Sequence, residues 1–438
     1  MVAHREQPVW AAAEGRQPCD RATGARDGSA MTSAERRWLV FGGFALSVVL
    51  FFVVYKPWNL ASDFMIGAPV GRDFVNFWTG GHLALAGRLD LLVDFAGYND
   101  FIATTFDHHN PLDERIFSYP PHILLFLVPF AALPFIPATL LWTALNVWLV
   151  DRAVCLLAPD APALRLAACL SPAVVTMVAF GHFGGALAFL AVYAVTRADA
   201  RPPMSGICLA LMSVKPQFAL GLGVFLLLTG RWRPVLWAVP ATACLVGLSL
   251  AAFGFKPWIN FVEWTMPFHA KVLSVYAHEA LWTVVSLYSA VRLMGFSAAA
   301  GYGVQCVYAM VALIGSAALA IRCGMTSRVV ALGLFAVVAA LPYFANYDLA
   351  IIAPAVAVAL FADRPGESRP FLAIVPATLL WIAPICSSAF DAMSLPVVSL
   401  GVSAVLLLAL YGQAIACRRA GPSVPGFAVA GRMTSGKV

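Results

Sequence analysis

The chain has 438 residues, of which 61% are hydrophobic and 11% charged, with a formal net charge of +6. So few polar side chains cannot cover a water-soluble globule of this length, and the composition therefore predicts a polytopic membrane protein. Its spanning segments are expected to be helices, because the alternation that a membrane β-strand needs is absent. The positive charge does not indicate nucleic-acid binding, because the basic residues form short clusters beside apolar segments.

These basic clusters set the expected topology. They are Arg36–Arg37, 197–201, 231–233, 322–328, 364–369 and Arg418–Arg419. Under the positive-inside rule they mark the cytoplasmic side, so both termini are expected in the cytoplasm. Residues 1–37, within which Met31 is a possible start, predict a disordered cytoplasmic tail, and residues 421–438 predict a second tail. Residues 38–420 are then the transmembrane domain.

The first span is predicted at residues 38–55, which carry no charge and are long enough to cross about 27 Å of hydrocarbon. The segment that follows, residues 56–120, has eight acidic residues against three arginines. This balance is opposite in sign to that of the whole chain. We therefore expect a long first extracytoplasmic loop that contains amphipathic helices.

Residues 73–87 of this loop predict one such helix. At 100° per residue, Asp73 heads a stripe of small and polar residues, and Phe74 and Trp78 share the adjoining face. The stripe consists of Asn76, Gly80, Ala84 and Gly87. It is expected to leave room for a ligand beside the carboxylate, while the aromatic face rests on the bilayer. The alternative is that Asp73 only caps the helix.

Further apolar segments bring the expected total to about 11–13 membrane segments. They lie at 121–135, 137–157, 164–180, 184–196, 203–230, 234–253, 298–321, 329–345, 349–361, 370–389 and 396–417. The segment at 203–230 is expected to break near Pro216, and parity then requires that one piece between residues 120 and 230 does not cross. Residues 254–297 space aromatic side chains three and four apart, which predicts a second extracytoplasmic loop lying in the bilayer interface.

The cysteines and histidines predict no metal site. The nine cysteines occur singly, mostly within apolar segments, so neither a disulfide nor a zinc site is expected. No two histidines have the spacing of a helical zinc site, and the adjacent pair His108–His109 is expected in a solvated loop.

Four short motifs follow one another along the chain. They are GRDFVNFWTGGHLALAG at 71–87, FSYPPH at 117–122, KPQ at 215–217 with GRWR at 230–233, and LPYFANYDLAIIAP at 341–354. In this order the chain resembles glycosyltransferase family 87, the polyprenol-phosphate-mannose-dependent mannosyltransferases of the GT-C superfamily, over most of residues 38–420. The resemblance implies a GT-C-like membrane fold and a donor sugar carried on a lipid phosphate. No metal and no cofactor beyond that donor substrate are expected.

The resemblance also implies a role for one residue, and the chemistry of the side chains suggests roles for others. An Asp in the first extracytoplasmic loop is the general base of the enzymes that this chain looks like, and Asp73 matches that position. Lys215 lies in an apolar stretch and is expected to meet the donor phosphate, or else to snorkel to the headgroups. Arg72 is a second phosphate candidate, with a surface ion pair as the alternative. The other candidate substrate-binding residues are Asn76, Tyr119, His182, Gln217, Tyr347 and Asp348.

The leading hypothesis is an inverting membrane glycosyltransferase. It moves a hexose, mannose by resemblance, from a polyprenyl phosphate to a lipid or glycan acceptor at the extracytoplasmic face of a bacterial inner membrane. Its partners would be membrane lipids, the lipid-linked donor and the acceptor, with no nucleic acid. The alternatives are a multi-pass transporter or lipid flippase, and a noncatalytic assembly subunit. A transporter is expected to hold its ionisable residues at mid-membrane on broken helices, whereas the acids here collect in one loop.

Overall fold

The computed structural model describes residues 33–55, 72–106, 115–274, 284–361, 380–384 and 396–420. Within these ranges all regular elements are helical, and the one strand-like pairing is an antiparallel bridge between Val284 and Ala345. The prediction of an all-α polytopic membrane protein is confirmed. The predicted tails lie outside the described residues, except that residues 33–37 belong to the first helix.

The helices follow one another without a sheet. The first are α1 (Ser33–Tyr55), α2 (Arg72–Leu85), α3 (Phe95–Phe106), α4 (Leu124–Ala131), α5 (Phe135–Leu157), α6 (Pro162–Cys169), α7 (Pro172–Phe180), α8 (Gly184–Thr196), α9 (Pro202–Leu211) and α10 (Pro216–Leu228). The later ones are α11 (Trp232–Phe253), α12 (Lys256–Asn260), α13 (Met266–Ser274), α15 (Leu287–Leu293), α16 (Ala298–Cys323), α17 (Ser327–Ala339), α18 (Ala353–Phe361) and α20 (Val397–Ala420). Short 3-10 helices are η2 (Leu89–Leu92), η4 (Pro121–Ile123), η5 (Met212–Val214) and η8 (Asn346–Ile352), and Phe261–Thr265 is a π-helical turn.

Four of the described helices are long and apolar enough to cross a membrane: α5, α11, α16 and residues 397–415 of α20. Helices α6 and α7, bent by 46° at their junction, meet the same criterion as a pair. Six shorter apolar helices of 10–17 residues accompany them among the described residues. These shorter helices are the segments that raised the number expected from the sequence.

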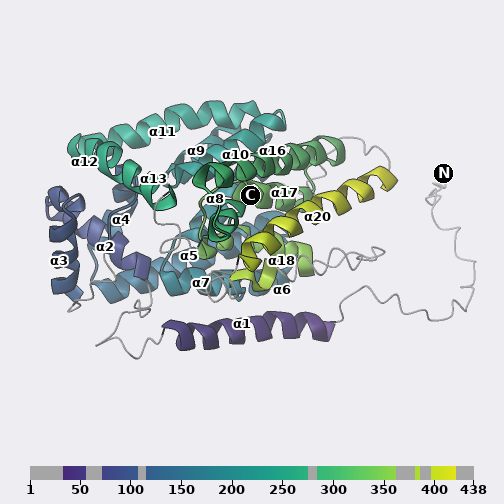
Figure 1. Ribbon diagram of the computed structural model, residues 1–438, viewed down its shortest axis with the longest axis horizontal. Coiled ribbons are helices and arrows are strands. Elements are labelled where there is room, and N and C mark those ends of the chain that lie inside the picture. The colour runs from purple at the N-terminus through teal and green to yellow at the C-terminus, as the bar shows by residue number, and fades with distance from the viewer. Residues whose placement is uncertain are drawn as a thin grey trace, which may run out of the picture.

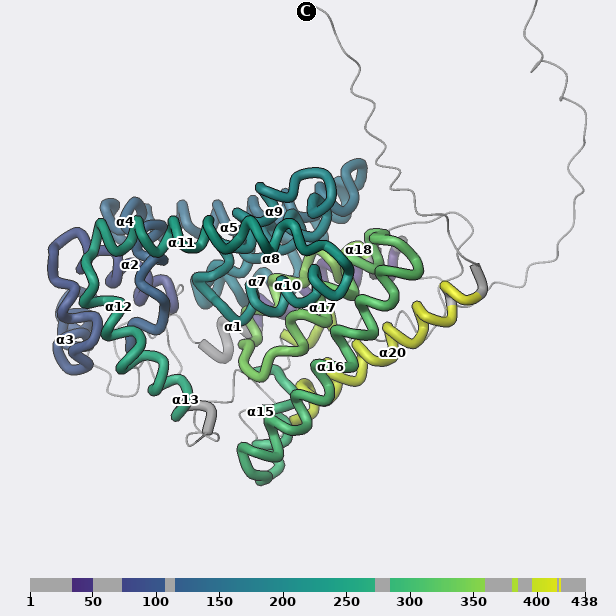
Figure 2. The backbone as a smooth tube through the Cα atoms, turned by 90° about the horizontal axis from the view of Figure 1, so that it is seen from above, coloured from purple at the N-terminus to yellow at the C-terminus, as the bar shows by residue number. Residues whose placement is uncertain are grey.

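The first loop and the basic turns lie at opposite ends of the helical body. Helices α2, α3 and α12 lie together at the left end in Figures 1 and 2, and α11 runs away from them along one side of the body. The basic turn 231–233, where α11 begins, is therefore at the opposite end. There Arg231 pairs with Asp199 at 3.0 Å, which joins this turn to the basic turn 197–201. The basic clusters at these two turns thus lie on the same side of the body.

Helices α5 and α8 pack side by side in the same direction. Trp142 donates a hydrogen bond from its indole to the carbonyl of Gly181 at 2.9 Å, and one turn later Asn146 accepts one from the backbone N–H of Ala186 at 3.1 Å. A Cβ added to Gly185 would lie 2.1 Å from the Asn146 carbonyl oxygen. Glycine at this position therefore allows the close approach of the two backbones.

Three short helices, α8, α10 and α17, do not extend to the end of the body where α2 lies. Helices α8, α10 and α17 have 13 residues each, so each is about 20 Å long, less than the roughly 30 Å of a bilayer core. Helices α8 and α10 end at the basic turns 197–201 and 231–233, and α17 begins beside the end of α5, where the Ser327 hydroxyl donates to the Leu157 carbonyl. Their other ends, at 181–183, Lys215 and 340–345, are therefore recessed. The break expected near Pro216 is confirmed. These recessed turns are where polar groups gather.

The packing of α2 contradicts the prediction that its aromatic face rests on the bilayer. Phe74 and Trp78 are buried, and the Phe74 ring lies 5.3 Å from that of Trp142. The stripe of small residues is not open either, because a Cβ on Gly80 would meet the ring of Phe117 at 2.2 Å. The helical periodicity predicted the two faces of α2 correctly. The aromatic face was expected to contact lipid and the small residues a ligand, but both faces pack against other parts of the protein.

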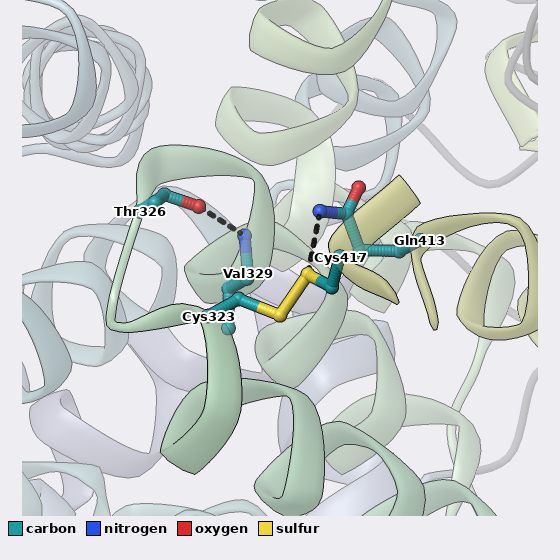
Figure 3. The surroundings of a disulfide bond; sticks show 5 residues. All are labelled: Cys323, Thr326, Val329, Gln413 and Cys417. Atoms are coloured by element: carbon teal, nitrogen blue, oxygen red, sulfur yellow. Dashed lines mark hydrogen bonds between the residues drawn. A yellow bond between two sulfur atoms is a disulfide. The ribbon is translucent and has the colours of Figure 1, made fainter. Parts of the chain in front are cut away.

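A disulfide between Cys323 and Cys417 shows that the prediction of no disulfide was wrong. It joins the last turn of α16 to α20, with a Cα–Cα distance of 6.2 Å (Figure 3). The two helices run in the same direction, as the hydrogen bond from the Tyr308 hydroxyl to the Ser403 carbonyl also shows. Neither cysteine has a partner nearby in the sequence, so only the helix packing reveals the pair.

The second loop is a broken amphipathic helix. Trp264 and Phe268 are 68% and 40% exposed, as expected for side chains at a bilayer interface. Trp258 points inward instead, where its indole donates to the Ser249 hydroxyl at 2.7 Å and stacks on the ring of His122. The segment is therefore anchored to the body on one side, and residues 275–283 of the predicted loop lie outside the described residues.

The α5–α8 contact generates a stability prediction. Gly185→Ala should lower the free energy of unfolding by about 1–3 kcal/mol, because the added methyl group meets backbone that cannot rotate away. The measurement is thermal or denaturant unfolding in detergent. Gly223→Ala in α10 is the control, since no atom lies within 4 Å of its added Cβ. This control should be neutral or stabilise by up to about 1 kcal/mol, and equal destabilisation by both variants would contradict the packing.

Candidate active site

Five side chains from four segments meet at the recessed turns. They are Tyr119, His182, Lys215, Tyr347 and Asp348, here called the polar cluster. All five were candidates from the sequence. Each lies in a loop or turn or in the first turn of a short helix. The cluster therefore depends on the breaks in the short helices.

The centre of the cluster is a buried ion pair. The Lys215 ammonium lies 2.7 Å from Asp348 Oδ1, and the two residues are only 7% and 1% exposed. Asp348 is also fixed by its second oxygen, which accepts the backbone N–H of Ala345. The alternative that Lys215 snorkels to the headgroups is thus excluded. Its ammonium also lies 5.2–5.7 Å from the ring centres of three aromatic residues: Phe183, Phe218 and Tyr347.

His182 links this pair to the first loop. It follows Gly181, whose left-handed backbone ends α7 with φ of 69°. Its Nε2 lies 3.2 Å from the Tyr119 hydroxyl, while Nδ1 is 3.9 Å from Asp348 Oδ1, beyond hydrogen-bond distance. The ring is stacked on Tyr347 at 4.4 Å. His182 is therefore fixed in place by Tyr119 and by stacking.

Asp73, in the first turn of α2, acts on this cluster through its charge. It is half-buried, and its charge acts on both Tyr119 and Tyr343. Burial raises the pKa of the Tyr119 hydroxyl well above its usual value, and the charges of Asp73 and Asp348 raise it further. Tyr119 is accordingly a neutral hydrogen-bonding group between the two carboxylates.

The remaining candidates lie around the cluster. Asn76 uses its amide to hold the loop, because it donates to the Ile116 carbonyl at 2.9 Å and accepts from the Tyr98 hydroxyl. Gln217 is half-buried in the first turn of α10, and the described residues give it no hydrogen bond to the cluster. Arg72 is the first residue of α2, and its side chain is outside the description.

Aromatic walls around the cluster were missed by the sequence analysis. Phe77 is fully buried, with its ring centre 5.8 Å from that of His182, and Phe183 lies 4.3 Å from the same ring. Phe77 follows the expected period of α2, but only the packing of α2 against the α7–α8 turn identifies it as part of the site. Among the described residues no three His, Cys, Asp or Glu side chains are grouped to hold a metal.

The arrangement has three chemical capacities. A half-buried carboxylate, Asp73, can accept a proton, and the Lys215 ammonium has further N–H groups beyond the one that Asp348 binds. The rings of Tyr119 and Tyr347 are partly exposed and can stack on the apolar face of a sugar ring. A small hollow lies beside Tyr119, and its lining includes Phe117, Pro257 and Phe261.

The sequence of the chain matches one protein family. Residues 117–344 match the model of glycosyltransferase family 87, which is more than half of the chain. No curated protein and no solved structure matches the chain. The match includes Tyr119, His182 and Lys215, while Asp73 and Asp348 lie on either side of it.

The buried ion pair generates a double-substitution prediction. Lys215→Met should lower the free energy of unfolding by about 3–5 kcal/mol, because it leaves the Asp348 carboxylate buried without its cation. Lys215→Met combined with Asp348→Asn should cost less than the sum of the two single changes, measured by unfolding in detergent.

The control is the ion pair at the basic end, in which the Asp199 side chain is 62% exposed. Asp199→Asn should change the free energy of unfolding by no more than about 1 kcal/mol. Strictly additive effects at Lys215 and Asp348 would contradict the ion pair.

Proposed function

The chain belongs to glycosyltransferase family 87, and from this premise we propose that it transfers a hexose, mannose by family resemblance, from a polyprenyl phosphate to a lipid or glycan acceptor. Membership makes it a membrane glycosyltransferase. We place the reaction at the extracytoplasmic face of a bacterial inner membrane, because the polar cluster lies toward the end opposite the basic turns. The donor is the substrate, and the reaction uses no cofactor.

The observation that carries the proposal is that an acid and a buried cation adjoin the same cluster. The charge of Asp73 acts on Tyr119, and Lys215 pairs with Asp348 beside Tyr347. In the proposed reaction Asp73 takes the proton from the acceptor hydroxyl, whose oxygen attacks C1 of the sugar. The bond from C1 to the phosphate oxygen breaks with inversion, and its electron pair leaves with the lipid phosphate. Asp73 therefore acts on the attacking hydroxyl, and Lys215 acts on the leaving phosphate.

Lys215 supports this assignment through its free donors. Its ammonium has three N–H groups, one of which binds Asp348, so others can meet a phosphate oxygen. Asp348 holds the ammonium in a fixed position before the donor arrives, so little reorganisation is needed when charge develops on the leaving phosphate. The recessed position keeps this pair away from bulk water, where the same charge would be screened.

The second candidate is a transporter or lipid flippase, and one observation favours it. A buried ion pair on broken helices is also what a transporter uses to bind a charged substrate inside the membrane. The two functions differ at Asp73, because a transporter does not require a proton acceptor beside an acceptor hydroxyl. Family membership favours the transferase.

Asp73→Asn tests the proposal. The amide keeps the size of the side chain and its capacity as a helix cap, but it takes no proton at working pH. Expression and melting temperature should stay near wild type, while kcat for sugar transfer falls by roughly 10²- to 10⁴-fold. Asp73→Glu should retain at most partial activity, because the extra methylene displaces the oxygen.

The control is Asp90→Asn in η2, which removes an exposed carboxylate of the same loop and should leave kcat unchanged. An Asp73→Asn enzyme that turns over near the wild-type rate with saturating donor would move the role of base to another acid, or remove the enzyme assignment.

A further inference from the structure

His269 is a histidine of the second loop whose position no role described above explains. It lies in α13, between the exposed Phe268 and Ala270, and its own ring turns toward the body. The ring centre is 6.4 Å from that of Tyr343 in the recessed 340–345 turn. The charge of Lys215 also acts on this ring. His269 therefore lies beside the recessed turn that leads into the Tyr347–Asp348 segment of the polar cluster.

One nitrogen of this ring is fixed by the protein. The ring makes a hydrogen bond to the backbone of Ser118, and this bond raises the pKa of His269, so the ring is the donor. Nε2 is buried and has no hydrogen-bond partner among the described residues. The donor is therefore Nδ1–H, which fixes the tautomer of the neutral ring and makes Nε2 an acceptor.

The ring is neutral at working pH. Burial is the largest effect and lowers the pKa of His269, the Ser118 bond opposes it, and the Lys215 charge lowers the pKa further. A neutral ring with a lone pair at Nε2 is a poor partner for a phosphate oxygen, which is itself an acceptor. It is a good partner for a hydroxyl group. An acceptor that is buried with no partner among the described residues can receive one from a bound ligand, and left unsatisfied it would cost free energy.

We infer that Nε2 of His269 accepts a hydrogen bond from a hydroxyl of the sugar being transferred, which makes His269 a residue that determines donor specificity. The inference rests on the proposed function, in which Lys215 meets the donor phosphate. The sugar is the group joined directly to that phosphate, and it is therefore the hydroxyl-bearing group within reach of a ring that lies near Lys215. The Ser118 bond and the Tyr343 contact hold the acceptor atom in a fixed direction.

Two substitutions separate the ligand contact from the fold. His269→Asn keeps an amide N–H in the place of Nδ1 and can retain the bond to Ser118, but it has no atom at the position of Nε2. His269→Gln carries its amide oxygen to that position. With polyprenyl-phosphate mannose as the probe, His269→Asn should raise the KM for the donor by about ten-fold, while His269→Gln stays within about three-fold of wild type.

Monodeoxy analogues of the donor sugar identify the hydroxyl. One analogue, lacking the hydroxyl that meets Nε2, should be a poorer donor for wild type by about the same factor and should be used equally by wild type and His269→Asn. With the other analogues, the KM for the donor should still be higher for His269→Asn than for wild type. Phe268→Leu is the control for disturbance of α13 and should leave the donor KM unchanged. The melting temperature of His269→Asn without donor should also match wild type.

Two failures are distinguishable. A wild-type protein that transfers no sugar from this donor would overturn the proposed function and the role of His269 with it. An active wild type whose donor KM is matched by His269→Asn would overturn the role of His269 alone. A fall of several degrees in the melting temperature of His269→Asn would also overturn it, because Nε2 would then have a structural partner.

Discussion

The ion pair between Lys215 and Asp348 is the constraint around which the site is built. Two charges can be buried this deeply only when each compensates the other, and here they come from segments 133 residues apart in the sequence. The pair brings the start of α10 against η8, and the ring of Tyr347 beside it places His182 and, through it, Tyr119. The loop before η4 is thereby positioned over the same recess.

The short helices explain why this pair is possible in a membrane protein. A helix that crossed the full bilayer would satisfy its own backbone and leave no free ends at mid-depth. Because α8, α10 and α17 stop after 13 residues, their terminal residues place polar groups inside the body rather than at its surface. Helix α2 packs beside this recess, with Phe74 and Phe77 buried, the Phe77 ring against that of His182, and Asp73 in its first turn.

The sequence predicted the helical class, the break at Pro216 and the residues that form the polar cluster, because composition and short motifs depend on residues that are close in the sequence. It did not predict which distant residues these groups contact. The period of α2 showed an aromatic face and a stripe of small residues, but periodicity cannot distinguish lipid from Phe117 or Trp142 as the neighbour. Likewise, the apolar stretch around Lys215 indicated that its charge has a function. Its pairing with Asp348 and the Cys323–Cys417 bond could not be predicted, because both join segments that are far apart in the sequence.

The central claim is that the recessed cluster transfers a sugar from a lipid phosphate. The most direct test reconstitutes the purified protein with acceptor lipids and supplies radiolabelled mannose, either on a polyprenyl phosphate or on a nucleoside diphosphate. Label should move from the polyprenyl phosphate to a new glycolipid and not from the nucleotide sugar. Transfer from the nucleotide sugar, or movement of the labelled lipid across the bilayer without a new glycosidic bond, would contradict the claim.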